Sequence, residues 1–303
     1  MSVRKVPEPK YDKDVKKITS YYAKARDLII VELLKHVETG SDAIKINQQA
    51  SLLRQVDVIL RDLNVTVQQT IEEGILQSYQ EGQAALAYSV GDFKTISEAA
   101  EGVAFSLLAK EAVDAIIADT FDDLLSATNL TSRRIKRIVR QTVAEKMRLD
   151  MARQNGLAVM KSNIAEELTK KGFSKTVKEE GFVGIVDRKG RKWELNRYVE
   201  LVVRTKYKHA RFEGIRNEAA ERGVDLAVIS SHGAKDACSR YEGMIISMNG
   251  ATNGYPTLSE LRKGNAIFHP NCKHTIYPIR DTSLLSDEER EVSRKLTENY
   301  NNS

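Results

Sequence analysis

Few residues in this 303-residue chain are of the kinds that cross-link a protein or anchor it in a membrane. The chain has two cysteines and one tryptophan, and aromatic residues make up only 6% of it. No stretch approaches the roughly 18 uninterrupted apolar residues that a membrane-spanning helix requires, and the first residues lack the apolar segment of a secretory signal. We therefore expect no membrane span, and we expect folding in a cytoplasm, where a disulfide is disfavoured.

Common catalytic motifs are absent as well. The chain contains no Gly-rich phosphate-binding loop, no His-Glu-x-x-His and no Gly-x-Ser-x-Gly element. We therefore expect a protein that is not an enzyme. The alternative is a Cys/His metal-dependent hydrolase or nuclease, in which Cys238 pairs with His232 or His274, or a bound metal activates water.

Apolar residues in the first half recur every three or four positions, which predicts long amphipathic helices. Two helices are expected over residues 11–40 and 41–88, and a return helix over residues 97–120. We interpret residues 129–132 as a break that caps a further helix. The apolar stripe over residues 52–79 is longer than one partner helix covers, so we expect both the return helix and another protein chain to pack on it.

Positive charge is concentrated in the middle of the chain. Residues 131–211 carry 22 lysines and arginines against 9 acidic residues, whereas residues 1–130 carry 14 against 20. Such a block faces either nucleic acid phosphates or an acidic protein surface, and an ordinary solvated helix face is the alternative. The candidate DNA-binding residues lie at its start, where they fall on a predicted helix: Arg133, Arg134, Lys136, Arg137 and Arg140.

Composition changes near residue 172, where several glycines appear and where we place a domain boundary. The expected fold class is α+β, with a mainly helical N-terminal half of long helices and a small C-terminal α+β domain containing a short antiparallel sheet. In chain order we expect a helical docking domain (1–171, with a loose arm at 1–10 and basic helices at 131–171), the α+β domain (172–281) and a polar tail (282–303).

Short apolar runs bounded by turn residues define the elements of the second domain. They predict a β-hairpin over residues 184–195, with an Asp-x-x-Gly turn, and a helix over residues 196–222. Three strands over residues 226–229, 243–248 and 275–279 are expected to pair in one antiparallel sheet, and a short final helix should begin after Ser286.

Both cysteines and three of the five histidines fall within one segment of this domain. Thiolate and imidazole suit zinc in tetrahedral geometry, so a structural zinc site is one interpretation. Buried thiols and loop histidines without a metal are the other. The candidate ligands are His232, Cys238, His269, Cys272 and His274. A site of four would use Cys238, Cys272, His274 and either His232 or His269.

The same segment resembles a known protein family. The runs 229–238, 241–244 and 269–274 resemble the C-terminal signature of phage minor head proteins, which include the Mu F-like and SPP1-type head morphogenesis proteins and the related phage minor capsid protein 2. The preceding helix around residues 204–214 is similar to the helix that those families carry there. The chain departs from their pattern at Lys273, where arginine is usual, and in having a single cysteine in the first cluster instead of a pair.

The resemblance covers roughly residues 190–280, and it implies a structural minor head protein of a tailed bacteriophage or prophage. Such a protein would associate with the portal vertex and act in head morphogenesis, DNA packaging or delivery. Its implied partners are the portal protein, the major capsid protein, or both, together with packaged double-stranded DNA. It would be present in several copies in the virion head at the portal vertex, and in the host cytoplasm during assembly.

Overall fold

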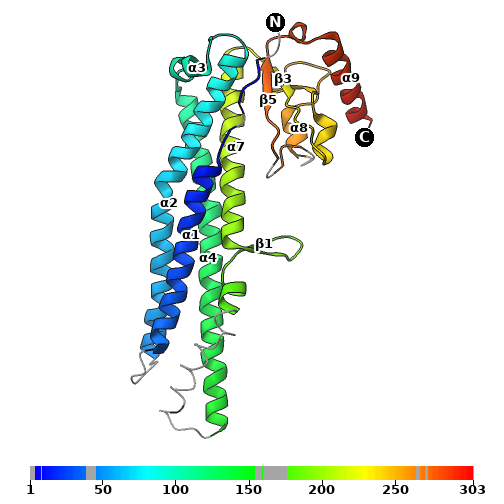
Figure 1. Ribbon diagram of the computed structural model, residues 1–303. Coiled ribbons are helices and arrows are strands. Elements are labelled where there is room, and N and C mark those ends of the chain that lie inside the picture. Colours follow the sequence, from blue (N-terminus) through cyan, green and yellow to red (C-terminus); the bar gives the residue numbers. More distant parts are fainter. Residues whose placement is uncertain are drawn as a thin grey trace. The chain divides into compact units, whose positions relative to one another are not determined.

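The computed structural model describes residues 4–7, 9–38, 46–153, 159, 176–263, 267–269 and 272–302. The expected helix end and start within residues 39–45, and the boundary at residue 172, lie outside these residues. In chain order the elements are α1 (Asp12–Glu38), α2 (Ile46–Ser89), α3 (Ile96–Gly102), α4 (Leu107–Ala152), η1 (Val177–Gly181), β1 (Val183–Val186), β2 (Lys192–Glu194), α7 (Leu195–Glu221), β3 (Leu226–Ile229), η2 (Ala237–Tyr241), β4 (Ile245–Ser247), α8 (Leu258–Lys263), β5 (Ile276–Ile279), η3 (Thr282–Leu284) and α9 (Asp287–Asn301) (Figure 1).

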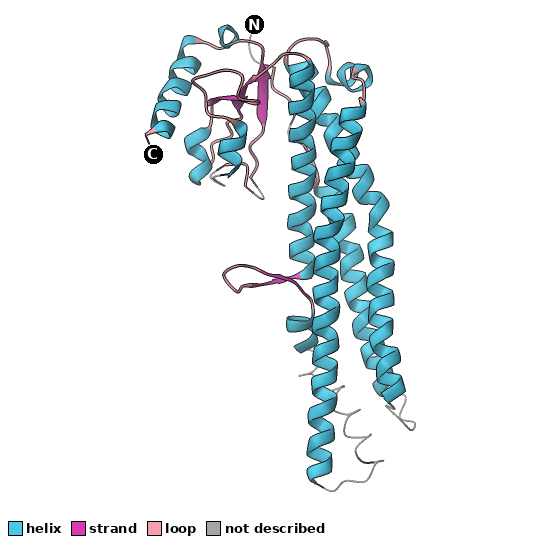
Figure 2. Cartoon of the chain, turned by 180° about the vertical axis from the view of Figure 1, so that it is seen from behind, coloured by secondary structure: helices cyan, strands magenta, loops and turns pink. Residues whose placement is uncertain are grey.

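Two compact units make up the chain. Unit 1 contains residues 1–11, 72–118 and 204–303, and unit 2 contains residues 12–71 and 119–203. Each unit is assembled from segments far apart in sequence, because α2, α4 and α7 contribute residues to both. Figure 2 shows that helices dominate and that the strands are few and short. The predicted fold class, long helices followed by a small α+β region with antiparallel strands, is confirmed.

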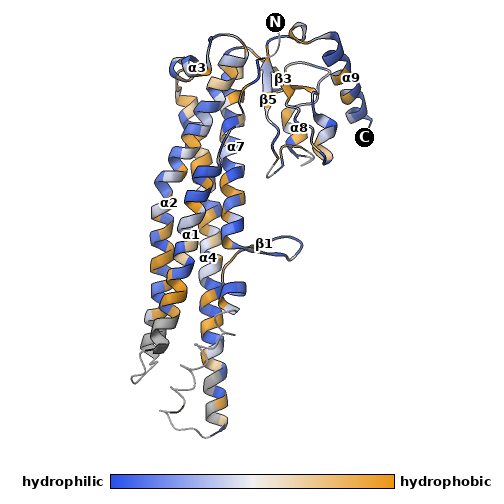
Figure 3. Ribbon diagram, viewed as in Figure 1, coloured by the Kyte–Doolittle hydropathy of each residue, from blue (hydrophilic) through white to orange (hydrophobic). Residues whose placement is uncertain are grey.

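Helix α1 of unit 2 buries the face that its periodicity predicts. The buried positions recur at intervals of three or four residues, so they form one apolar stripe that appears as repeated orange bands in Figure 3. Each large apolar side chain that is fully buried contributes about 1.5–3 kcal/mol relative to an exposed one. The residues of the stripe, none more than 5% exposed, are Val15, Ile18, Tyr22, Ala25, Ile29 and Leu33.

The apolar stripe of α2 is covered within the chain itself. Val56, Leu63 and Val67 in unit 2 are buried, and so are Ile75 and Tyr79 in unit 1. The expectation that another protein chain packs on this stripe is therefore wrong. The stripe is therefore packed inside the two units to which α2 contributes.

The predicted break at residues 129–132 is also wrong, because α4 is continuous from Leu107 to Ala152. The polar side chains that suggested a cap make tertiary hydrogen bonds inside unit 2 instead. Thr131 Oγ1 donates to the Val183 carbonyl at 3.1 Å, and Ser132 Oγ donates to Asp57 Oδ1 at 2.7 Å. Capping propensity is a weak local preference that such contacts override.

Two glycines allow α2 and α7 to cross in backbone contact within unit 1. A Cβ atom on Gly82 would lie 2.1 Å from the Arg211 carbonyl oxygen, and one on Gly214 would lie 2.1 Å from the Tyr79 carbonyl oxygen. Real Cβ atoms do not approach backbone oxygens this closely. The crossing therefore requires glycine at both positions.

The N-terminal arm is not loose over its described residues. Val6 is 4% exposed, Arg4 Nη1 donates to the Phe93 carbonyl at 2.7 Å, and Arg211 Nη2 donates to the Pro7 carbonyl at 3.3 Å. The arm is thus a strap onto the chain's own unit 1, and a buried arginine holds it in place.

The three predicted strands form one antiparallel sheet in unit 1, in the order β4-β3-β5. The predicted hairpin and the helix after it are confirmed as β1–β2 and α7. The final helix α9 begins with a capping box at Ser286, and its Ser293 Oγ accepts a hydrogen bond from the Ile245 N–H at 2.8 Å. Helix α9 is therefore packed against the sheet of unit 1.

Candidate metal centre

The pairing of β3 with β5 brings the two Cys/His clusters together. Ile229 at the end of β3 lies opposite Ile276 at the start of β5, so the loop after β3 and the loop before β5 emerge at the same end of the sheet. The first loop leads to Cys238 in η2, and the second carries Cys272 and His274. Both sulfurs belong to the apolar core beneath the sheet.

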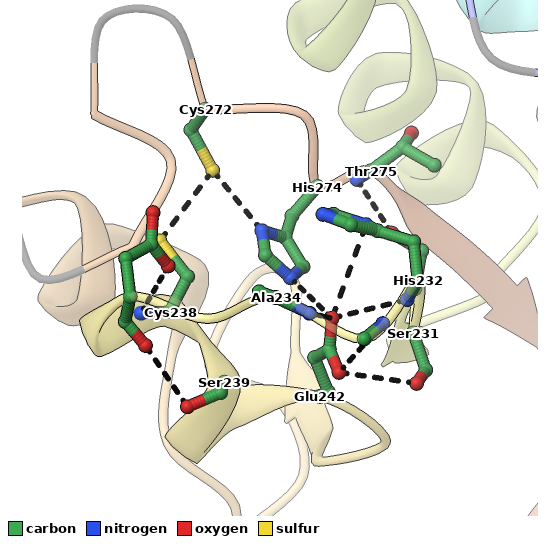
Figure 4. A network of polar contacts seen from close by, with 12 residues as sticks. Ser231, His232, Ala234, Cys238, Ser239, Glu242, Cys272, His274 and Thr275 are labelled. Carbon is green, nitrogen blue, oxygen red and sulfur yellow. Dashed lines mark hydrogen bonds and ion pairs between the residues drawn. The ribbon is translucent and has the colours of Figure 1, made fainter.

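Side chains from the two loops converge on a pair of sulfur atoms (Figure 4). The Cys238 and Cys272 Sγ atoms are 3.9 Å apart, His274 Nδ1 is 3.3 Å from Cys272 Sγ, and His269 Nε2 is 3.1 Å from Cys238 Sγ. Two sulfurs bound tetrahedrally to one zinc at about 2.3 Å would lie about 3.8 Å apart, whereas a disulfide has its sulfurs at about 2.05 Å. The spacing therefore fits a shared ion and not a disulfide.

The second nitrogen of His274 is held by a carboxylate. Its Nε2 atom lies 3.1 Å from Glu242 Oε1, and the His274 side chain is only 2% exposed. A metal-binding histidine commonly makes such a contact, which fixes its tautomer and its ring orientation. Burial lowers the pKa of His274 more than Glu242 raises it, which favours the neutral imidazole that binds metals.

Glu242 is itself fixed by the loop after β3. It accepts hydrogen bonds from the backbone N–H groups of His232, Gly233 and Ala234 at 3.0–3.2 Å. Burial opposes its charge, but the N–H groups of His232 and Ala234 and the His274 contact lower the pKa of Glu242 to about 2. The carboxylate is therefore ionised near neutral pH. It supplies negative charge next to His274 Nε2, whereas Cys272 Sγ lies next to Nδ1 of the same ring.

The Cys238 thiol is protonated when no cation is present. Burial, and after it the neighbouring Cys272, raises the pKa of Cys238 to about 12. A divalent cation reverses this preference, because metal binding stabilises the thiolate and releases the proton.

The loop that carries His269 and Cys272 is anchored on α7. Phe268 has a φ of 58°, the left-handed region that a bulky residue rarely adopts. Its ring packs edge-on against Phe212 at 5.0 Å, and Lys208 Nζ donates to the Cys272 carbonyl at 2.6 Å. These contacts hold an unfavourable backbone conformation next to His269.

His232 lies outside the sulfur cluster. Its ring centroid is 4.2 Å from that of His274, and its Nδ1 atom is 3.9 Å from Glu242 Oε1. Cys238, Cys272 and His274 form one group with ligand atoms within 4.8 Å of one another, His269 joins Cys238 and Asp236 in a second, and His232 joins Glu242 and His274 in a third.

The sequence did not predict Glu242 as a partner of His274. Only the fold brings Glu242, from the first Cys/His cluster, next to His274 in the second.

The candidate DNA-binding residues do not form one free basic face. Arg134 Nε donates to the Glu180 carbonyl at 2.7 Å, and Lys136 pairs with Asp57. Only the other three side chains are exposed, along one side of α4: Arg133, Arg137 and Arg140.

Comparison with known proteins identifies the family. A family model described as phage minor capsid protein 2 matches residues 17–301, which include most of both units and the whole Cys/His cluster. No match was found among curated proteins or among solved structures. In the part of the chain that the structure describes, none of the helices combines the length and the apolar character needed to cross a membrane. The chain belongs to the phage minor capsid protein 2 family and is thus a structural bacteriophage protein.

Proposed function

We propose that the protein is a minor head protein of a tailed bacteriophage or prophage that associates with the portal vertex and acts in head morphogenesis, DNA packaging or delivery. The observation that carries this proposal is the family match over residues 17–301. Its partners would be the portal protein, the major capsid protein, or both, and several copies would enter each virion after assembly in the host cytoplasm. The long helices then serve as the framework that presents docking surfaces.

An exposed apolar run in unit 1 is the surface that we assign to the portal. Leu107 and Leu108 begin α4 and are 73% and 55% exposed, and Phe105, two residues before the helix, is 40% exposed. Consecutive exposed apolar residues are unfavourable in a solvated protein unless a partner covers them. This run replaces the α2 stripe, which is buried, as the candidate docking surface.

A pull-down with the portal protein of the same phage tests this assignment. The double variant Leu107→Asp/Leu108→Asp should reduce capture at least about tenfold, because charge at a desolvated contact costs more than 1.4 kcal/mol. Val58→Asp/Val65→Asp is the matched control, since Val58 and Val65 are 39% and 66% exposed on α2, and it should bind like the native protein. Equal capture of the double variant would place the portal contact elsewhere, and no capture of the native protein would remove the portal from the proposal.

The Cys/His cluster is proposed as a structural zinc site with the ligands Cys238, Cys272, His269 and His274. Support comes from the sulfur spacing and from Glu242 behind His274. A structural site of this kind ties two loops that are distant in sequence, so its binding free energy adds to folding. Glu242 is occupied by three backbone N–H groups and by His274, which favours a structural role over that of a general base.

Glu242→Gln should weaken zinc binding about 10- to 100-fold, the effect typical of losing a carboxylate partner of a metal-bound histidine. Competition with a chromophoric chelator measures the affinity. Asp281→Asn is a suitable control, because Asp281 caps η3 outside the cluster and its loss should leave the affinity unchanged. An unchanged affinity in Glu242→Gln would contradict the role given to this carboxylate.

Contact with packaged double-stranded DNA is proposed for the basic middle of the chain. Arg133, Arg137 and Arg140 on α4 are the exposed members of the original candidate set. Arg134 and Lys136 are engaged with Glu180 and Asp57, so the α4 face offers fewer cations than its sequence suggests.

A further inference from the structure

The β1–β2 hairpin of unit 2 concentrates exposed positive charge on a rigid turn. Four basic side chains are exposed along the turn and the start of β2: Arg188, Lys189, Arg191 and Lys192. A hairpin that projects several cations from fixed positions presents them to an anion with little loss of conformational freedom on binding.

Asp187 is the residue that makes this turn rigid. Its carboxylate accepts hydrogen bonds from the backbone N–H groups of Lys189 and Arg191 at 3.0 and 2.9 Å. The same carboxylate accepts from Arg191 Nε at 2.7 Å and from Trp193 Nε1 at 3.1 Å. The Trp193 contact, followed by the Arg191 N–H, holds the pKa of Asp187 well below its ordinary value, so the carboxylate stays charged. The turn and the indole ring are therefore oriented by one group.

A basic groove of about 760 Å³ runs beside the hairpin, bounded by α1, η1, β2 and α7. Both of its acidic residues lie near Arg26, with Asp27 at 3.1 Å and Glu194 at 4.0 Å. Arg191 Nε lies 2.7 Å from Asp187 Oδ2 and Lys192 Nζ lies 3.6 Å from Glu180 Oε2. Among the described residues, Lys178 and Arg197 have no acidic partner. The groove thus keeps an excess of positive charge, and the residues that line it are Arg26, Asp27, Lys178, Arg191, Lys192, Trp193, Glu194 and Arg197.

The groove also contains the single tryptophan of the chain. Trp193 is half-buried, and the Arg191 guanidinium lies 5.9 Å from its ring centroid. Arginine matches phosphate oxygens with paired donors, and an aromatic face beside cations accepts a base or sugar. An acidic protein segment would use the cations but would gain less from the indole ring.

We propose that this basic groove binds the phosphate backbone of nucleic acid, with the hairpin turn and Arg197 supplying the main charge contacts. The inference rests on the proposed contact with packaged DNA. It places the main DNA-contacting residues at the groove and the hairpin turn instead of on the α4 face. Over the described part of the chain, the groove and the hairpin turn together keep four cations without an acidic partner, Lys178, Arg188, Lys189 and Arg197, whereas the α4 face keeps three because Arg134 and Lys136 are engaged.

Titration of the full chain with a 30-base-pair duplex across a salt series tests the proposal. A parallel titration with a 30-nucleotide single strand shows whether the protein prefers double- or single-stranded nucleic acid. Binding is followed by Trp193 fluorescence and by anisotropy of a labelled oligonucleotide. The groove variant is Arg188→Gln/Lys189→Gln/Arg197→Gln, which leaves Asp187 and its hydrogen bonds intact. The matched control is Lys13→Gln/Lys16→Gln/Lys17→Gln, which removes the same charge from the exposed face of α1. A third variant changes Arg133, Arg137 and Arg140 of α4 to glutamine.

The native protein should bind with quenched tryptophan fluorescence. The groove variant should bind at least about tenfold more weakly, and its slope of log affinity against log salt should fall by about 2.7, because each lost duplex phosphate contact removes about 0.9. The control should stay within about twofold of the native protein.

Three results would overturn the inference in distinguishable ways. If only the α4 variant loses affinity, DNA contact stands but the groove is not its site. Should polyglutamate of equal charge bind as tightly with the same fluorescence change, an acidic protein is the partner. If the native protein binds no nucleic acid at low salt, both the groove and the proposed DNA contact fail, while the portal assignment is unaffected.

Discussion

Cys272→Ser should abolish zinc binding and destabilise unit 1. The native protein is expected to retain about one zinc ion per chain, held by two thiolates and two imidazoles, and the variant to retain none. If free zinc is about 1,000 times its Kd, the bound ion stabilises the folded state by about 4 kcal/mol, and the variant loses this contribution. Elemental analysis and thermal unfolding followed by circular dichroism measure the two effects.

A chelator and a second variant make this test specific. Chelator should lower the melting temperature of the native protein to that of Cys272→Ser and should leave the variant unchanged. His232→Ala should keep the ion, since the His232 ring packs beside His274 and the carboxylate, outside the sulfur cluster. Native protein that takes up no zinc on reconstitution, with a melting temperature insensitive to chelator, would show the cysteines to be ordinary core residues.

Gly214→Ala should produce the other large effect, a destabilisation of about 3 kcal/mol. The new Cβ would lie 2.1 Å from the Tyr79 carbonyl oxygen. This oxygen belongs to the backbone of α2, so it cannot rotate away from the clash as a side-chain atom can. Relief requires α2 and α7 to separate, which exposes neighbours such as Tyr207 that are now buried. The melting temperature should fall by roughly 6–12 °C for a unit of this size.

Gly102→Ala supplies the matched control for this substitution. Its added Cβ would meet only the ring of Phe93, at 2.5 Å, and that half-buried side chain has room to turn. Gly102 ends α3 whereas Gly214 lies inside α7, where the intrinsic helix preference favours alanine over glycine. A lower stability of Gly214→Ala than of Gly102→Ala therefore reports the crossing of α2 and α7. Equal stability of the two variants would mean that these helices do not approach as closely as described.

Much of the secondary structure could be predicted because it depends on local periodicity. The stripe on α1 from Val15 to Leu33 identifies its helix and its buried face without any knowledge of what covers it. Strands β3 and β5 were similarly visible as short apolar runs bounded by turns. The Asp187-x-x-Gly190 turn predicted the hairpin that joins β1 and β2.

Errors arose where a distant residue competes with a local preference. Thr131 and Ser132 suggested a helix cap, but Val183 and Asp57 accept their hydrogen bonds and the helix continues. The basic face of α4 was overestimated for the same reason, because Asp57 pairs with Lys136 across 79 residues of sequence. No single-sequence pattern encodes such pairings.

The sequence by itself determined the long helices, the small antiparallel sheet and the set of candidate sulfur and imidazole ligands, since these follow from spacing and residue chemistry. The tertiary structure alone decided which ligands meet, because the β3–β5 pairing sets Cys238 beside Cys272 and leaves His232 beyond His274. It also decided that the α2 stripe is internal and that Arg134 and Lys136 of the basic α4 face are engaged with Glu180 and Asp57. These outcomes depend on contacts between residues far apart in the chain, which local physical preferences do not fix.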